Sequence, residues 1–126
     1  MSTILVVEDN ATNMELSTFL LESAGHTVVP ATSAESGLTL ALECRPDLIL
    51  MDIQLPGMDG LQATALLNTN EATRGIPVIA LTALAMKGDE ERIRAAGCDG
   101  YVAKPLSYRD FLEVIRDQLA KSAGVK

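Results

Sequence analysis

Five residues with side chains suited to binding a metal ion or a phosphoryl group follow short apolar segments of this sequence. Glu8 and Asp9 follow the first such segment, Asp52 a second, Thr82 a third and Lys104 a fourth. Two carboxylates about 4 Å apart repel each other by roughly 4 kcal/mol at an effective dielectric constant of 20. Lys104 and a hard divalent cation would offset that repulsion. Carboxylate oxygens with room for water suit Mg²⁺, which also binds phosphate oxygens.

Each of these residues also has an ordinary structural explanation. The pair Glu8-Asp9 can begin a helix and interact favourably with its dipole, and Asp52 can begin a turn. Thr82 can be a hydroxyl at a strand end, and Lys104, with the proline that follows it, can form a turn. A shared functional site becomes the better explanation only if the fold brings all five side chains together.

The apolar segments that precede these residues predict buried strands. Continuous apolar runs of this length are typical of parallel strands that are covered on both faces. We expect five strands, at Thr3–Val7, His26–Val29, Asp47–Asp52, Ile76–Leu81 and Tyr101–Ala103.

Between and after the strands, capping residues and helical spacing predict five helices. We place them after Asn10, after Ser33, from Asp59 to Leu67, from Lys87 to Ala96, and from Ser107 onward. The spacing of apolar residues suggests that Leu16, Leu20, Leu21 and Ala24 face the core in the first helix, and Leu38, Ala41 and Leu42 in the second.

Alternating strands and helices with short connections predict a doubly wound, flavodoxin-like α/β sandwich. Its five-stranded parallel sheet has the strand order 2-1-3-4-5, with helices on both faces. The carboxyl ends of parallel strands meet at one edge of the sheet, so the acids, the threonine and Lys104 should converge there. Neighbouring strands are only about 4.8 Å apart.

Length and composition define one acidic globular domain. The chain has 126 residues, 48% of them hydrophobic and 21% charged, with a net charge of −7. We expect a domain at residues 1–121 with a frayed end at 122–126. The acidity argues against nucleic-acid binding, and we find neither a signal peptide nor a span of roughly 20 apolar residues. We therefore expect a cytoplasmic protein with no membrane insertion, and with Cys44 and Cys98 reduced and partly buried.

The motif set resembles that of bacterial response-regulator receiver domains over nearly the whole chain. The matching residues are Glu8-Asp9, Asp52, Thr82-Ala83, Tyr101 and Lys104-Pro105, in the same order and spacing. Two stretches, residues 46–56 and 85–94, are more similar still to single-domain regulators of cell division within that family. The chain also begins at a methionine just before the first strand and stops soon after the last helix, so we expect a stand-alone protein.

The resemblance implies a phosphoacceptor of a two-component system or phosphorelay. Asp52 would accept a phosphoryl group from a histidine kinase or a histidine phosphotransfer protein. Asp9, Asp52 and the backbone carbonyl of Gln54 would bind Mg²⁺, with Glu8 acting through water. Lys104, held in the site by a cis peptide bond to the following proline, would neutralise charge on the transferred group.

The resemblance also implies how the signal leaves the domain. Thr82 would hydrogen-bond the phosphate, and Tyr101 would turn inward to fill the space left by Thr82. The surface of the fourth helix, fifth strand and fifth helix would then bind a downstream protein. Gln54 and Leu84 would flank the phosphate with opposing effects on its lifetime. Such a protein catalyses only its own phosphorylation and dephosphorylation and is otherwise not an enzyme.

Three other identities remain to be weighed. Phosphohydrolases with an aspartate nucleophile carry a second acid two residues later, where this chain has Gln54. Flavin-binding electron carriers need a hydroxyl- and glycine-rich loop after the first strand, whereas Glu8-Asp9 would repel phosphate. The aromatic content of 3% also offers a flavin little to stack on. A receiver domain cut from a hybrid histidine kinase or a larger regulator remains an alternative.

Overall fold

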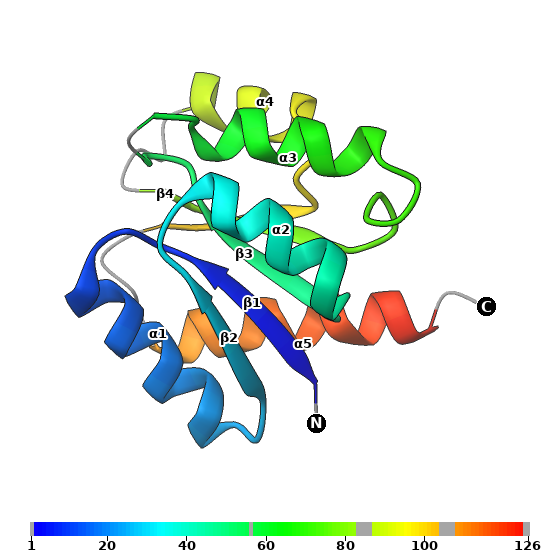
Figure 1. Ribbon diagram of the computed structural model, residues 1–126. Coiled ribbons are helices and arrows are strands. Elements are labelled where there is room, and N and C mark those ends of the chain that lie inside the picture. The colour runs from blue at the N-terminus through cyan, green and yellow to red at the C-terminus, as the bar shows by residue number, and fades with distance from the viewer. Residues whose placement is uncertain (1, 56, 83–86, 104–107, 125–126) are drawn as a thin grey trace.

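The computed structural model describes residues 2–55, 57–82, 87–103 and 108–124 of the chain. Strands and helices alternate along these residues (Figure 1). Their order is β1 (Thr3–Val7), α1 (Ala11–Ser23), β2 (Thr27–Ala31), α2 (Ala34–Cys44), β3 (Leu48–Asp52), α3 (Gly60–Thr69), β4 (Val78–Thr82), α4 (Lys87–Ala95), β5 (Gly100–Ala103) and α5 (Tyr108–Gly124).

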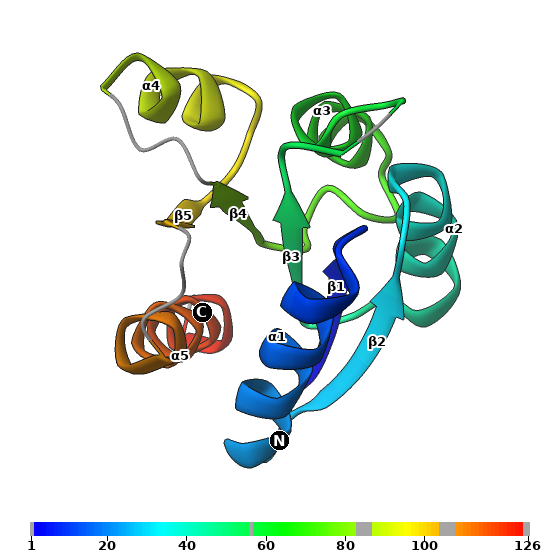
Figure 2. The same cartoon turned by 90° about the vertical axis from the view of Figure 1, so that its left-hand side faces the viewer.

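The five strands form one parallel sheet in the order β2-β1-β3-β4-β5, which confirms the predicted topology. Every neighbouring pair of strands is parallel. Helices α1 and α5 cover one face of the sheet, and α2, α3 and α4 cover the other (Figures 1 and 2). Strands β3 and β4 are buried along their whole length, as their continuous apolar runs predict.

The two faces of the sheet have separate hydrophobic cores. On one face, Leu20 and Leu21 of α1 pack with Phe111 and Ile115 of α5. On the other face, the core contains small and medium side chains, among them Ala41 of α2, Leu67 of α3 and Ile93 of α4. The sheet is therefore held between two layers that bury its central strands.

Side-chain caps confirm the predicted starts of α1, α2 and α3, whereas Ser107, the predicted start of the last helix, lies outside the described residues. Asn10 accepts a hydrogen bond from the backbone of Asn13 at the start of α1. Ser33 caps α2 and Asp59 caps α3, and each forms a reciprocal capping box with the residue three positions later. These caps fix where each helix begins relative to the strand before it.

Several element boundaries differ from the sequence prediction by one to three residues, and strand β4, for example, begins at Val78 instead of Ile76. Strand β2 continues through Pro30 to Ala31, which is tolerated because β2 is an edge strand and proline need not donate to a neighbour there. Helix α3 extends to Thr69 instead of Leu67. Helix α5 continues to Gly124, beyond the end we expected at residue 121.

The prediction that Leu16 and Leu42 face the core is wrong. Leu16 and Leu42 are 41% and 45% exposed, respectively. Ala24, the C-cap of α1, is exposed as well, so its predicted core position is also wrong. The residues of α2 that face the sheet are Ala34, Gly37 and Ala41, which are small because the helix lies close to the sheet. A Cβ atom on Gly37 would lie 2.8 Å from a methyl carbon of Val7. This close approach leaves Leu42 on the outer side of the helix.

The two cysteines differ in their surroundings. Cys98 is buried, as expected, and burial raises the pKa of its thiol to about 11. Cys44 is exposed at the end of α2, so the prediction of a partly buried side chain is wrong for this residue. Among the helices of the described residues, none is long and apolar enough to cross a bilayer.

Candidate functional site

Three carboxylates converge at the carboxyl edge of the sheet, as the sequence predicts. Glu8 and Asp9 follow β1, and Asp52 is the last residue of the adjacent strand β3. One carboxylate oxygen from each of the three residues lies within 4.8 Å of the others. Glu8 and Asp52 are only 1% and 2% exposed, whereas Asp9 is exposed. The cluster therefore has a buried base and an open outer side.

Backbone amides orient the two buried carboxylates. The amide of Gln54 donates to Oδ1 of Asp52 at 2.8 Å, and the amide of Asn10 donates to Oε2 of Glu8 at 3.3 Å. The Glu8 amide itself donates to the carbonyl of Ala31 at 2.9 Å, which ties the end of β1 to β2. Both acids are thus held in place by their own strand–helix connections.

The carboxylate cluster fits a hard divalent cation. All three side chains supply oxygen, the ligand type that Mg²⁺ and Ca²⁺ prefer. Mg²⁺ usually keeps several waters and takes only one or two protein carboxylates directly. The exposed position of Asp9 leaves one side of the cluster open to water, which suits Mg²⁺ with an open coordination position.

Asp9 is not the N-cap of α1, because Asn10 occupies that position. The side chain of Asn10 accepts the hydrogen bond from Asn13 that a capping residue accepts. The first turn of α1 contains no acidic residue. The simple structural explanation for Asp9, a helix cap, therefore does not account for its place in the cluster.

Gly60 lies against the backbone of Asp52, a feature that sequence reasoning missed. A Cβ atom on Gly60 would clash with the Asp52 carbonyl oxygen and with Cα of Ile53. Only glycine allows the first turn of α3 to pack this closely on the end of β3. The sequence signal is the pair Asp59-Gly60, which by itself predicts only a helix start.

Thr82 and Tyr101 point to the same face of the sheet. Thr82 is the fully buried last residue of β4 and pairs with Ala103, two residues after Tyr101 on β5. Side chains two residues apart on a strand share a face. Half-buried Tyr101 packs against the core on the side of α2, α3 and α4. Strand register thus places both predicted switch residues on one side.

Tyr101 also contacts α4 through a residue that the sequence did not single out. Its hydroxyl donates to Oε2 of Glu90 at 3.5 Å, a long hydrogen bond. The other carboxylate oxygen, Oε1 of Glu90, lies 3.5 Å from Nε of Arg94 one turn later. The carboxylate of Glu90 therefore links β5 to the outer face of α4.

Several predicted site residues lie outside the described part of the chain. These are Ala83, Leu84, Lys104 and Pro105. The backbone of Gln54 is described only through its amide contact with Asp52, so a metal-binding role for its carbonyl stays a prediction. The structure therefore brings together Glu8, Asp9 and Asp52.

Comparison with known proteins identifies the same type of domain. The family model for the response regulator receiver domain matches residues 4–116. The polar-differentiation response regulator DivK of Brucella ovis is 51% identical over 116 residues, which make up 92% of this chain and 94% of DivK.

Solved structures also match along nearly the whole chain. The receiver domain of sensor histidine kinase PA1611 from Pseudomonas aeruginosa PAO1, solved with a magnesium ion in its active-site cleft, is 35% identical with a TM-score of 0.88. That match covers 94% of this chain and 98% of the other. Chemotaxis protein CheY4 of Vibrio cholerae, at 23% identity and a TM-score of 0.88, covers 93% of this chain and 98% of its own and shares the fold. The chain belongs to the family of response regulator receiver domains, the signalling domains of two-component systems.

Proposed function

We propose that this protein is a phosphoacceptor in which Asp52 takes up a phosphoryl group in a reaction that needs Mg²⁺. The observation that carries the proposal is the meeting of Glu8, Asp9 and Asp52 at the edge between β1 and β3. The magnesium ion named for the related PA1611 receiver domain supports Mg²⁺ as the metal. Asp9, Asp52 and the Gln54 carbonyl would hold the ion, with Glu8 acting through water.

The chemistry of the proposal requires a carboxylate nucleophile and positive charge around the transferred group. An oxygen of Asp52 attacks the phosphorus of a phosphohistidine, a P–O bond forms, and the P–N bond to the imidazole breaks. When bound, Mg²⁺ supplies charge that stabilises the phosphoryl oxygens in the transition state. The Gln54 amide holds the attacking carboxylate at 2.8 Å, and Lys104 would add a second positive charge. Water later hydrolyses the acyl phosphate and restores the carboxylate.

The donor would be a histidine kinase or a histidine phosphotransfer protein, and the direct test is transfer from one to this chain. A set of purified histidine kinases, each autophosphorylated with radiolabelled ATP, is mixed with the chain and Mg²⁺. At least one donor should lose its label to this protein within minutes, and chelation of Mg²⁺ should prevent the transfer. Absence of transfer from every donor, together with no labelling by a small-molecule phosphodonor, would contradict the proposal.

Replacing Asp9 should separate metal binding from folding. Loss of even an outer-shell partner typically weakens metal binding 10–100-fold, so Asp9→Ala should weaken Mg²⁺ binding by at least about tenfold. The same change removes a like charge from the cluster, so the metal-free protein should be no less stable than wild type. Mg²⁺ titration followed by amide spectra, with urea unfolding in EDTA, measures both effects.

Asn10→Ala is the matched control for Asp9→Ala. It removes the α1 cap and should cost about 1 kcal/mol of stability, while Mg²⁺ affinity stays close to that of wild type. If Asp9→Ala instead lowers stability and leaves Mg²⁺ affinity unchanged, Asp9 has a structural role and is not a ligand.

The proposed conformational change that passes on the signal begins with Thr82 and Tyr101. Phosphorylation adds roughly −1.5 to −2 charges and strong acceptor oxygens at Asp52, and the Thr82 hydroxyl would move to donate to them. Tyr101 would then turn further inward and give up its contact with Glu90. That change would alter the surface of α4, β5 and α5, where a downstream protein would bind.

Thr82→Ala should accept a phosphoryl group but respond to it weakly. The substitution removes the hydroxyl donor that would link the phosphate to Tyr101. A ligand shifts a conformational equilibrium only through interactions that differ between the two states, so without this hydrogen bond the phosphate should shift the equilibrium less. Amide spectra with and without phosphorylation should show reduced changes at Tyr101 and Glu90 compared with wild type. Thr82→Ser keeps the hydroxyl and should restore the response. Equal changes in wild type and Thr82→Ala would rule out this route.

A role like that of DivK, in the control of the cell cycle, is the biological setting we propose. The 51% identity to DivK exceeds the 35% identity to the receiver domain of a sensor histidine kinase. DivK is therefore the better guide to the biological role of this protein. In this setting the protein would act in the cytoplasm through protein contacts, without binding nucleic acid. Its only catalytic acts would be its own phosphorylation and dephosphorylation.

A further inference from the structure

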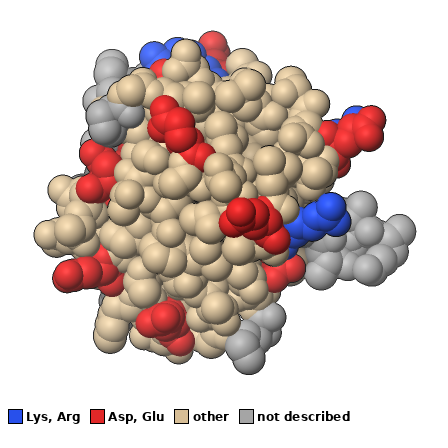
Figure 3. All heavy atoms as spheres, in the orientation of Figure 1, with Lys and Arg blue, Asp and Glu red and all other residues tan. Residues whose placement is uncertain are grey.

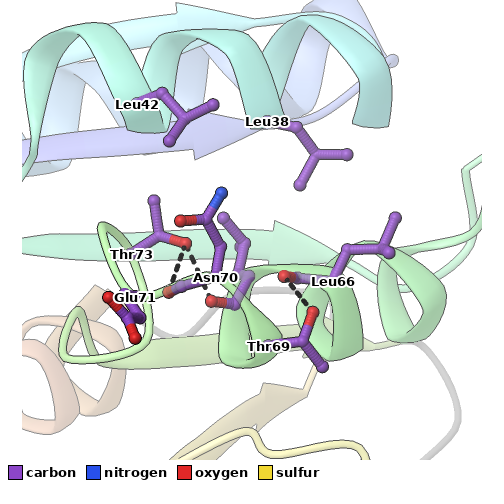
Figure 4. Close-up of a pocket in the computed structure, with 8 residues that line it drawn as sticks. Leu38, Leu42, Leu66, Thr69, Asn70, Glu71 and Thr73 are labelled. Carbon is purple, nitrogen blue, oxygen red and sulfur yellow. Dashed lines mark hydrogen bonds between the residues drawn. The ribbon is translucent and has the colours of Figure 1, made fainter.

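A groove with leucine walls lies between α2 and α3, on the outer side of the helices (Figure 4). Leu38 and Leu42 of α2 form one wall, and Leu66 and Leu67 of α3 form the other. Glu71, in the connection after α3, lies at one end of the groove. Its volume is about 610 Å³. We call this feature the α2–α3 groove.

Two leucines on the walls of the groove are unusually exposed. Leu42 is 45% and Leu66 is 48% exposed, and they are two of the four large hydrophobic side chains exposed in the described part of the chain. A second hollow of about 530 Å³ lies on the other side of Leu66, lined mainly by apolar atoms and including Met58 and Ala65. Leu66 therefore forms a ridge between two hollows, and the apolar surface extends across α3.

The shape of this surface suits a helix better than a small molecule. Small-molecule sites bury 70–90% or more of the ligand, whereas here one leucine on each wall, Leu42 and Leu66, is nearly half exposed to solvent. A helix places side chains at positions i, i+3 or i+4, and i+7 along one face, and such a row fits on either side of a ridge like Leu66. Helices α2 and α3 are 11 and 10 residues long, so a partner helix of three to four turns would match them.

The charge around the groove indicates the sign of the charge that a partner should carry. Of the described residues that line the groove, Glu71 is the only charged one, and the basic residues nearest to it in the sequence, Arg45 and Arg74, follow α2 and Thr73. Glu71 lines the groove, and Glu35 lies on the same stripe of α2 as Leu38 and Leu42. Acidic side chains outnumber basic ones on the face that α2 presents in Figure 3. A second copy of this chain that used the same groove would bring another Glu71 to the interface and no Lys or Arg from the described groove lining.

We infer that the α2–α3 groove binds an amphipathic helix of a partner protein, whose apolar face is flanked by Lys or Arg. Leucine-sized side chains of the partner would pack against Leu42 and Leu66, and its basic residues would pair with Glu71 and Glu35. The site does not include Asp52 or the α4–β5–α5 surface, so the inference stands independently of the proposed phosphoacceptor function.

A designed peptide tests the inference directly. The probe is a helical peptide of about 14 residues, roughly 21 Å long, with leucines at positions i, i+3, i+7 and i+10 and lysines beside them. Two comparison peptides have the same composition with scrambled leucines, or the same leucines with glutamates in place of lysines. Amide spectra of the full chain should shift along α2 and α3 with the first peptide only.

Substitutions locate the binding and exclude a general hydrophobic effect. Leu66→Gln should weaken binding at least about tenfold, because a buried leucine contact is lost. Glu71→Gln should weaken it about two- to fivefold at low salt. Leu16→Gln, which changes a leucine of α1 that is 41% exposed, should leave the affinity unchanged. Both leucines are exposed enough that the variants should fold, which circular dichroism would check.

Three outcomes would overturn the inference. They are peptide-induced shifts confined to residues outside α2 and α3, equal binding of the three peptides, and binding by Leu66→Gln as tight as that of wild type. Analytical ultracentrifugation of the chain alone tests whether a second copy of the chain occupies the groove. If wild type is a dimer and Leu66→Gln is a monomer, a second copy covers the groove and the partner helix is excluded.

Discussion

Asp52→Ala is expected to gain no phosphoryl group from acetyl phosphate and Mg²⁺, whereas the wild-type chain gains one. Acetyl phosphate supplies the phosphoryl group without a partner protein, so the result depends only on groups in this chain. Asp52 is the one acid of the cluster that ends a central strand and is held by the Gln54 amide. Alanine removes the only oxygens that this position can offer as a nucleophile. Intact-mass measurement at neutral pH shows the added mass directly.

Asp110→Asn is the matched control, because Asp110 is exposed in the first turn of α5 and is not part of the carboxylate cluster. This variant should be labelled as fully as wild type, and EDTA should prevent labelling of both. Labelling of Asp52→Ala at the wild-type level would show that another side chain is the acceptor. Loss of labelling in Asp110→Asn would point to damage of the fold and not of the site.

Gly60→Ala is expected to destabilise the protein and to disturb the site together. The added Cβ would clash with the backbone of Asp52 and Ile53, which cannot rotate away as a flexible side chain can. Overpacking of this kind typically costs about 1–3 kcal/mol, and the gain in helix propensity from glycine to alanine recovers only about 1 kcal/mol. Because α3 would have to move from the end of β3, labelling of Asp52 should also slow.

Gly75→Ala is the control for this effect. Gly75 has open space around it, because a Cβ atom added there would have no neighbouring atom within 4 Å, and its backbone is not in the left-handed region. Its substitution should change the free energy of unfolding by less than about 1 kcal/mol. Urea unfolding of both variants measures the difference. Equal stability of the two would mean that α3 can shift without cost.

The order of elements and the site at the strand ends follow from the sequence alone. Continuous apolar runs identify strands buried on both faces, and caps such as Ser33 and Asp59 mark the helix starts. Short right-handed connections then leave few topologies, and the observed order is the expected one. Once the topology is known, an acid after β1 and an acid at the end of β3 must be neighbours, because strand spacing is fixed by backbone hydrogen bonds.

Which side of each helix faces the sheet depended on the tertiary structure. The sequence marks Leu42 as apolar, but Gly37 and Ala41 face the sheet because α2 lies close to Val7. Periodicity does not report that distance, since large and small apolar residues fit the same helical pattern. It therefore predicts core positions for Leu16 and Leu42, and the exposed α2–α3 groove could not be anticipated.

The sequence by itself determined the fold, the family and the carboxylates that could bind a metal, because these depend on residue type and order. The tertiary structure decided the contacts between residues distant in sequence, such as Gly60 with Asp52 and Tyr101 with Glu90. It also showed that Asn10, and not Asp9, caps α1. These features depend on distances of a few ångströms between packed elements, and close packing sets those distances through many side chains at once.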